Sequence, residues 1–165
     1  MCFRMSLAVV GGYDLFVHGE VTVHMEAAAL EIWRLVADVR NTGRFSPETF
    51  GAEWLDGVTE PALGARFRGH VKRNEIGPVY WTTCRVTACE PGREFGFAVM
   101  LGNRAVNNWH YKFSTNGTGT DVTESFQIPV PALLRATSFL GYLRKRRNMR
   151  DMRTTLERIR EVVEG

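Results

Sequence analysis

Cysteine is scarce in this sequence: the chain has three in 165 residues, and no two are spaced as Cys-x-x-Cys. Cys84 and Cys89 are five residues apart in a predicted strand. We expect them on opposite faces, where they neither form a disulfide nor share a metal ion. An odd number of cysteines without a paired motif is typical of a reducing compartment. The composition therefore predicts a cytoplasmic protein without a disulfide framework.

Long apolar runs are also missing. The first apolar stretch, Met5–Val10, is too short for a signal peptide. No later stretch approaches the ~20 apolar residues that span a bilayer. We therefore expect no signal peptide and no stable membrane association.

An excess of charge of one sign is absent as well. The chain has 21 basic and 18 acidic residues, a net charge of +3. The densest basic run, Arg144–Arg147, lacks the aromatic residues that alternate with basic ones where nucleic-acid bases are stacked. A solvated helix face is the favoured interpretation, and an anionic head group beside this run is the alternative. We expect no nucleic-acid partner.

Patterns for metal binding and nucleophilic catalysis are absent too. The four histidines lie in different predicted strands or strand ends, without helical ligand spacing or a carboxylate cluster. They are His18, His24, His70 and His110. No serine has a neighbouring Ser/His/Asp arrangement, and the glycine pairs mark turns rather than phosphate-binding loops. The sequence therefore predicts no metal site and no cofactor.

The composition that remains is that of an ordinary globular protein, with 44% hydrophobic and 24% charged residues. A chain of this length is expected to form one domain that buries ~70% of its unfolded surface. We expect residues 1–11 to form a loose leader and residues 12–165 to form the domain. Monomer and homodimer both remain open.

Hydrophobic periodicity predicts helices near both ends of the domain and strands between them. Residues 26–39 have helical spacing, with Glu26 in the first turn, where a negative charge suits the helix dipole. Residues 41–47 allow only a turn or a small helix. The predicted strands are residues 13–24, 52–56, 64–73, 79–90, 93–101, 104–114 and 120–128. Consecutive strands in the middle and helices at the ends indicate an α+β fold.

The last stretch, residues 131–165, is predicted to be the helix around which the domain is organised. One face carries an apolar residue at every third or fourth position: Met149, Met152, Leu156, Ile159 and Val163. This face does not continue in phase upstream of Gly141, and a helical glycine costs ~1 kcal/mol relative to alanine. We therefore predict a short amphipathic segment at 131–140 that gates a cavity, then a bend, then the main helix. One bent helix with two buried sides is the alternative.

Several short motifs resemble the START-like SRPBCC superfamily, especially its polyketide cyclase/dehydrase branch. They are Ala28, Trp33, Val36–Asp38, Phe45–Glu48, Leu63–Phe67, Arg85–Thr87, Glu90–Phe95 and Gly119–Glu124. The resemblance covers about residues 12–163. It implies a helix-grip (START/Bet v 1-like) fold, in which a curved antiparallel sheet wraps around the long C-terminal helix and leaves an internal cavity. Because cyclases, lipid carriers, aromatic-ligand binders and co-chaperones share this fold, the fold does not choose among them.

Strand alternation predicts which side chains face that cavity. In the last hairpin, a loop at 116–119 would pair Thr115 with Thr120, and Tyr111 with Glu124. The same register pairs Phe113 with Val122, Trp109 with Phe126, and Asn107 with Ile128. With the other inward-facing positions, the predicted ligand-binding residues are Trp54, Phe67, Thr82, Cys84, Phe95, Phe97, Trp109, Phe126 and Met149. Such a wall suits an apolar ligand with one or two oxygen atoms.

Glu124 is the most informative residue of this predicted interior. Burial would raise the pKa of its carboxyl and let it act as a general acid or base near neutrality. Tyr111 and Asn107 would then hold the carboxyl or orient substrate carbonyl groups. The alternative is a rim position, or a one-residue slip of register that sends Glu124 to solvent.

Three functions fit these features. The first is a carrier or binding protein for a hydrophobic small molecule, favoured by the aromatic wall and the sparse polar residues. The second is a polyketide cyclase, aromatase or dehydratase with Glu124 as general acid/base, because cyclisation needs mostly shape and a proton shuttle. The third, a co-chaperone-like interaction domain, has support only from the basic outer residues Arg66, Arg68 and Lys72.

Overall fold

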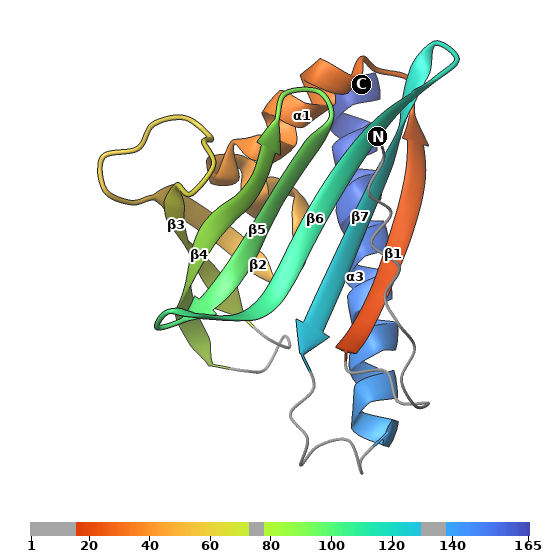
Figure 1. Cartoon of the computed structure of the whole chain (residues 1–165). Coiled ribbons are helices and arrows are strands. Elements are labelled where there is room, and N and C mark those ends of the chain that lie inside the picture. Colours follow the sequence, from red (N-terminus) through yellow and green to blue (C-terminus); the bar gives the residue numbers. More distant parts are fainter. Residues whose placement is uncertain (1–15, 73–77, 130–137) are drawn as a thin grey trace, which may run out of the picture.

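The computed structural model describes residues 16–72, 78–129 and 138–165. Its elements follow the predicted order of strand, short helices, six strands and long helix (Figure 1). The helical elements are α1 (Ala29–Ala37), the 3-10 turn η1 (Val39–Asn41), α2 (Thr42–Phe45) and α3 (Ser138–Glu164). The strands are β1 (Phe16–Met25), β2 (Thr49–Trp54), β3 (Arg66–Lys72), β4 (Val79–Glu90), β5 (Glu94–Leu101), β6 (Arg104–Asn116) and β7 (Gly119–Pro129). The expected leader lies outside the described residues.

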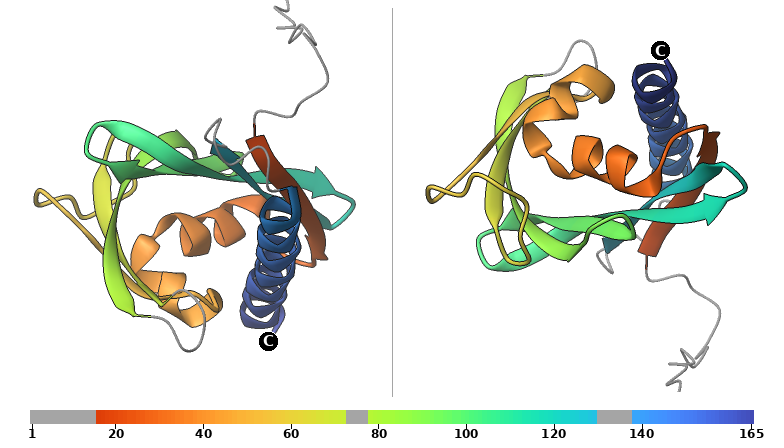
Figure 2. Two further views of the ribbon diagram at one scale, coloured as in Figure 1. Left: turned by 90° about the horizontal axis from the view of Figure 1, so that it is seen from below. Right: turned by 90° about the horizontal axis from the view of Figure 1, so that it is seen from above.

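The seven strands form one antiparallel sheet in the order β1-β7-β6-β5-β4-β3-β2. The first strand therefore lies beside the last, while the other neighbours are consecutive in the chain. Figure 2 shows the sheet curving around the helices. α3 lies along β1, and α2 lies beside β2. All helices thus lie on the concave side of the sheet, which encloses the interior.

Side-chain alternation decides which face of each strand meets this interior. On β1, Val21, Val23 and Met25 are buried, whereas Thr22 and His24 between them are exposed. On β3 the same alternation buries Phe67 between two exposed arginines. Each of these arginines pairs with an acidic residue on the outer side of the sheet. The period-2 pattern read from the sequence therefore separates inside from outside.

The β6–β7 hairpin has the predicted register. Tyr111 pairs with Glu124, and Thr115 pairs with Thr120. Trp109 pairs with Phe126, and Phe113 with Val122, also as expected. The hairpin turns at Gly117, whose φ of +63° suits glycine. This register decides that Glu124 faces inward, because a slip by one residue would reverse every side chain.

The prediction that Cys84 and Cys89 face opposite sides of the sheet is wrong. A bulge interrupts β4 between Val86 and Ala88 and shifts the register by one residue. A single extra residue reverses the alternation after it. Cys89 therefore pairs with the buried Phe95 and packs at the edge of the core on the same side as Cys84.

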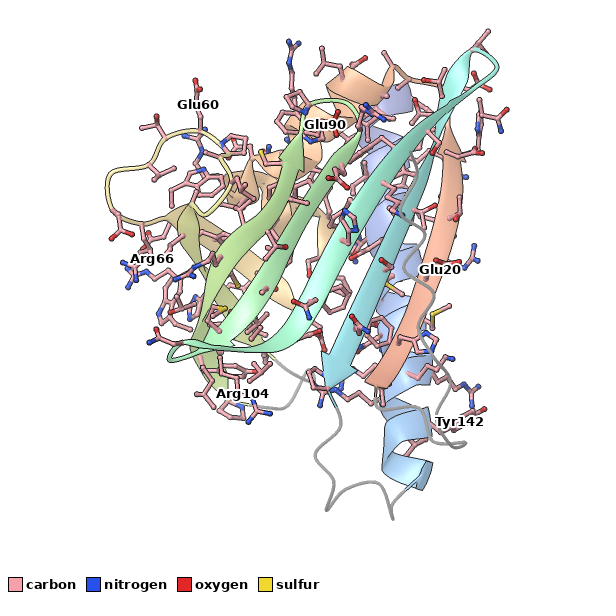
Figure 3. All side chains as sticks on the ribbon, in the orientation of Figure 1. Glu20, Glu60, Arg66, Glu90, Arg104 and Tyr142 are labelled. Atoms are coloured by element: carbon pink, nitrogen blue, oxygen red, sulfur yellow. The ribbon has the colours of Figure 1, made fainter. Side chains whose placement is uncertain are left out.

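The long helix is continuous where a bend was predicted. α3 runs from Ser138 through Gly141 to Glu164 without a break. Met152, Leu156 and Ile159 are buried on its inner face, as their spacing predicts. Tyr142 is exposed, at the end of α3 that extends beyond the sheet (Figure 3). Leu143, on the other side of the helix, is exposed as well, and most of the predicted lid at 131–140 lies outside the described residues.

The first helix begins later than predicted. α1 starts at Ala29, so Glu26 does not occupy its first turn; Glu31 does. Glu26 instead accepts hydrogen bonds from Thr118 and contacts His24 at the hairpin end of the sheet. The indole N–H of Trp33 donates to the carbonyl of Glu94 at 2.8 Å, which fixes α1 on the sheet. Within the described ranges, no helix is both long enough and apolar enough to cross a membrane.

Candidate functional site

A cavity of about 580 Å³ lies between the concave face of the sheet and the helices. Most of its walls come from inward-facing side chains of β3 to β7, and α1, η1, α2 and α3 close the other side. Its size falls within the ~300–1,000 Å³ of small-molecule sites. Nine of the predicted site residues line it: Phe67, Thr82, Cys84, Phe95, Phe97, Asn107, Trp109, Tyr111 and Glu124.

Aromatic side chains form one continuous part of this wall. The ring centroids of Phe67 and Phe97 are 5.2 Å apart, and the rings meet edge to face. Phe95 continues the row, 6.3 Å from Phe97. Trp109 is the direct cross-strand partner of Phe97. Strands β3, β5 and β6 thus supply an aromatic, apolar surface of the kind that binds apolar ligands.

Glu124 and Tyr111 form a buried hydrogen-bonded pair in the cavity wall. The Tyr111 hydroxyl donates to Glu124 Oε1 at 2.7 Å, and Glu124 is only 4% exposed. Burial raises the pKa of Glu124 to about 8, although the hydrogen bond from Tyr111 offsets part of this effect. Burial and the neighbouring carboxyl also raise the pKa of Tyr111, so the phenol stays a donor. At neutral pH the Glu124 side chain is therefore mainly a neutral carboxylic acid.

Two oxygen atoms in the wall are buried without a hydrogen-bond partner among the described residues. They are Oε2 of Glu124 and Oδ1 of Asn107. Both residues line the cavity. Because a buried polar atom without a partner costs ~1–3 kcal/mol, such atoms point to an interaction with a group that the described residues do not supply. The indole nitrogen of Trp54 is also buried and unpartnered, but Trp54 does not line the cavity.

Thr82 and Cys84 are the polar and sulfur-bearing residues of the β4 wall. The Thr82 hydroxyl donates to the carbonyl of Gly69 at 3.3 Å, so it is used within the sheet. Burial raises the pKa of the Cys84 thiol to about 12. A thiol with so high a pKa is a poor nucleophile at neutral pH. Cys84 therefore contributes to the wall as a small apolar group.

Three predicted ligand-binding residues lie outside the cavity lining: Trp54, Phe126 and Met149. Trp54 packs edge to face on Phe67, with ring centroids 5.7 Å apart. Phe126, whose ring lies 5.6 Å from that of Trp109, and Met149, which lies over Gly19 of β1, line a second and more open recess instead. Alternation therefore predicted that Phe126 is buried, but not which of the two hollows its side chain lines.

The helices contribute lining residues that sequence reasoning missed. Asp151, Thr155 and Ile159 lie four residues apart on α3 and face the cavity. Arg147 pairs with Asp151 at 3.4 Å and with Glu48 at 3.2 Å, which ties α3 to the segment before β2. The signal was present in the sequence: two polar residues at helical spacing share a face with an apolar residue.

A second recess, of about 860 Å³, is more open to solvent and lies mainly over β1, β6 and β7. Its lining includes His18 and Glu20, and Figure 3 shows Glu20 projecting outward from β1. It holds neither the Glu124–Tyr111 pair nor Asn107. In the part of the chain that the structure describes, no three His, Cys, Asp or Glu residues come together as a metal site. The Glu124–Tyr111 pair and Asn107 therefore belong to the inner cavity and not to this recess.

Comparison with known proteins gives the same picture of the fold. The family model described as "Polyketide cyclase / dehydrase and lipid transport" matches residues 17–164. A Polyketide_cyc-like protein from Corynebacterium glutamicum is 26% identical, with a TM-score of 0.62 over 90% of this chain and 92% of that one. The Zhui aromatase/cyclase from Streptomyces sp. R1128 is 18% identical, with a TM-score of 0.68 over 90% and 94%. No curated protein sequence matches significantly.

A START superfamily protein from Mycobacterium smegmatis also has this architecture, at 16% identity and a TM-score of 0.66, over 89% of this chain and 97% of that one. The expected helix-grip fold is therefore confirmed. At such low identities the similarity concerns the fold alone.

Proposed function

The chain belongs to the polyketide cyclase/dehydrase and lipid transport family, and on this premise we propose that it is a carrier or binding protein for a hydrophobic small molecule. The ligand, aromatic, polyketide-like or lipid-like, occupies the inner cavity. The observation that carries the proposal is the cavity itself, an aromatic wall with two unpartnered oxygen atoms. A core built only for stability would be filled and its polar atoms paired.

The proposal is tested by ligand binding with a matched pair of tryptophan variants. Trp109 lines the cavity, whereas Trp81 is 49% exposed and stacks on His70 on the outer face of the sheet. Isothermal titration with a fatty acid, a flavonoid and a polyphenol should show saturable binding of at least one class. Trp109→Ala should weaken that binding by about tenfold, because an aromatic contact surface is lost, and Trp81→Ala should leave it unchanged.

Native mass spectrometry of the protein as purified is the complementary measurement. A co-purifying small molecule that is lost in Trp109→Ala but retained in Trp81→Ala would support the carrier function. Equal binding by both variants, or no binding of any class by the native protein, would overturn it.

Catalysis is the second candidate function, and the buried Glu124 carboxyl favours it. A neutral acid in an apolar cavity is suited to donate a proton to a ketone oxygen as the enol carbon of the same substrate adds to that carbonyl carbon. The proton of the enol hydroxyl then returns to the carboxylate, so that cyclisation leaves Glu124 neutral. Tyr111 holds one carboxyl oxygen and leaves the other facing substrate. Asn107 is placed to orient a second oxygen of the substrate.

Turnover of a poly-β-keto mimic separates this candidate from a carrier. Glu124→Gln should lower turnover by ~10²-fold or more while binding persists, in line with the loss of a general acid. The control is Glu20→Gln, which removes an exposed carboxylate from the outer face of β1. Tyr111→Phe removes the hydrogen bond that partly lowers the Glu124 pKa and should move the pH profile upward. A native protein with binding but no turnover is a carrier.

The remaining expectations from the sequence also stay proposals. We infer that the protein acts in the cytoplasm without stable membrane association and without a nucleic-acid partner, as a monomer or a homodimer. These inferences rest on the cysteine pattern, the short apolar runs and the small net charge.

A further inference from the structure

The two cavity oxygen atoms without a partner among the described residues lie at different levels of the sheet, one on β6 and one on β7. Asn107 and Tyr111 are both on β6, four residues apart, and both line the cavity. Glu124 is the direct partner of Tyr111 across the hairpin and is hydrogen-bonded to it. At ~3.3 Å per residue, the levels of Asn107 and Glu124 are separated by about 13 Å along the strand.

The two oxygen atoms need opposite kinds of hydrogen-bonding partner on the ligand, because one of them donates a hydrogen bond and the other accepts one. Because Glu124 Oε1 already accepts from Tyr111, the proton of the neutral carboxyl lies on Oε2, which then donates. Its partner is a hydrogen-bond acceptor, such as a ketone oxygen. Oδ1 of Asn107 is an amide oxygen and accepts only, so its partner is a hydroxyl or amine.

The wall between these two levels is apolar. Trp109 lies midway between Asn107 and Tyr111 on the same strand, and Phe97 pairs with it from β5. A ligand that reaches both oxygen atoms therefore lies across Trp109 and Phe97, where a flat apolar body fits best. On this wall, Trp109 and Phe97 thus offer an apolar surface to the middle of the ligand.

We propose that the ligand is an elongated hydroxy ketone with a flat apolar core, whose ketone oxygen binds Glu124 and whose hydroxyl binds Asn107. Allowing for the reach of both side chains, the two ligand oxygen atoms are about 10 Å apart. This inference rests on the proposed binding function and adds the chemical class and length of the ligand. It also distinguishes the ligand from a fatty acid, which carries both oxygen atoms at one end.

A series of biphenyl probes tests the two groups separately. The probe 4-acetyl-4′-hydroxybiphenyl carries a ketone and a hydroxyl at opposite ends of a flat body. 4-Acetylbiphenyl lacks the hydroxyl, 4-ethyl-4′-hydroxybiphenyl lacks the ketone, and 4-ethylbiphenyl lacks both. Measured by isothermal titration at pH 6.5, each missing group should weaken binding by about five- to tenfold. In the one-ring probe 4-hydroxyacetophenone the two groups are too close, so its hydroxyl should add nothing over acetophenone.

Two variants assign each group to its partner. Asn107→Leu should abolish the advantage of 4-acetyl-4′-hydroxybiphenyl over 4-acetylbiphenyl and leave the affinity for 4-acetylbiphenyl within about twofold. Glu124→Gln keeps a donor toward the ketone and should retain binding of 4-acetylbiphenyl at pH 6.5. Between pH 6.5 and 9 that affinity should fall in the native protein, because Glu124 ionises, and stay constant in Glu124→Gln. Circular dichroism confirms that each variant is folded.

The outcomes separate this inference from the binding function. If 4-ethylbiphenyl binds as well as the three substituted probes, the cavity binds apolar molecules and the hydroxy ketone inference is overturned. If the hydroxyl helps equally in the native protein and in Asn107→Leu, the assignment to Asn107 is wrong. If the folded native protein binds a fatty acid, a flavonoid or a polyphenol but no biphenyl up to the solubility limit, this inference is overturned and the binding function stands; if it binds none of them, both are overturned. The inference stands only if both groups contribute, Asn107→Leu removes the contribution of the hydroxyl, and Glu124→Gln removes the fall in affinity for 4-acetylbiphenyl between pH 6.5 and 9.

Discussion

Replacing Glu124 by glutamine should make the protein more stable at neutral pH, and the gain should grow as the pH rises. The substitution is nearly isosteric, and the amide oxygen still accepts the hydrogen bond that Tyr111 donates. What changes is the titration. Burial raises the pKa of Glu124 from about 4.5 to about 8, so the fold favours the neutral acid.

The sign follows from proton linkage. Below about pH 4.5 the carboxyl is protonated in both the folded and the unfolded chain, and its titration does not affect stability. Between pH 4.5 and about 8 only the unfolded chain loses this proton, so the folded state loses stability as the pH rises. Above about pH 8 both states are ionised and the loss levels off. Glutamine removes this dependence.

The magnitude comes from the same two pKa values. The stability lost by the native protein is at most about 1.4 kcal/mol per pH unit. Summed over the window, the native protein loses about 2.5 kcal/mol between pH 5 and pH 7 and about 3.5 kcal/mol between pH 5 and pH 8. The stability difference between Glu124→Gln and the native protein should widen by these amounts, because glutamine does not titrate.

Urea denaturation followed by circular dichroism at pH 5, 6, 7 and 8 measures this difference. Glu20→Gln removes an exposed carboxylate and controls for the loss of one charge. Its difference from the native protein should change by much less over the same range. If Glu124→Gln is instead destabilised, most strongly at pH 8, then the carboxylate is ionised and paired in the folded state. The neutral acid, the catalytic role and the donor to a ligand ketone would then all be wrong.

Three further predictions concern the scaffold and the wall. Thr120→Val should lower the free energy of unfolding by about 1–2 kcal/mol, because the 2.8 Å hydrogen bond to a buried main-chain carbonyl is lost; an unchanged urea midpoint would contradict this. Gly119→Ala should cost about 2–3 kcal/mol, since the new methyl group meets the carbonyl oxygen of Met25, whereas Gly51→Ala meets nothing. Equal stability of these two variants would refute the close approach. Cys84, with the other cysteines replaced by serine, should react with iodoacetamide at pH 8 more than about 10²-fold slower in the folded protein than in urea. The reason is that burial raises the pKa of its thiol to about 12. Comparable reaction rates in the two states would show an accessible thiol.

The β6–β7 hairpin shows what can be predicted from the pattern of residues that are close in sequence. Its register follows from a short loop and from the match of apolar partners such as Phe113 and Val122, all within 22 residues of chain. Once that register is known, alternation sends Glu124 inward without further information. The most important residue of the candidate site was therefore predictable, because its position depends only on neighbours close in sequence.

The bulge in β4 shows where local pattern fails. Cys89 follows the bulge at Thr87 and faces the same side as Cys84, although counting residues places them on opposite sides. The continuous α3 is a similar case. An apolar face that changes phase at Gly141 indicates a bend, yet the helix continues past it with Tyr142 exposed beyond the sheet. Both outcomes depend on how β4 and α3 pack against segments that are distant in the chain.

The sequence by itself determined the order of the elements, the inward face of the strands apart from β4 beyond its bulge, and the aromatic nature of the interior, because hydrophobic periodicity is a local property. Only the tertiary structure decided that these faces enclose a cavity rather than a filled core. It also decided that Phe126 lines the second recess rather than the inner cavity, and that Oε2 of Glu124 and Oδ1 of Asn107 stay without partners among the described residues. Burial and hydrogen bonding depend on how closely segments far apart in the chain approach one another, and the pattern of any one segment does not contain that distance.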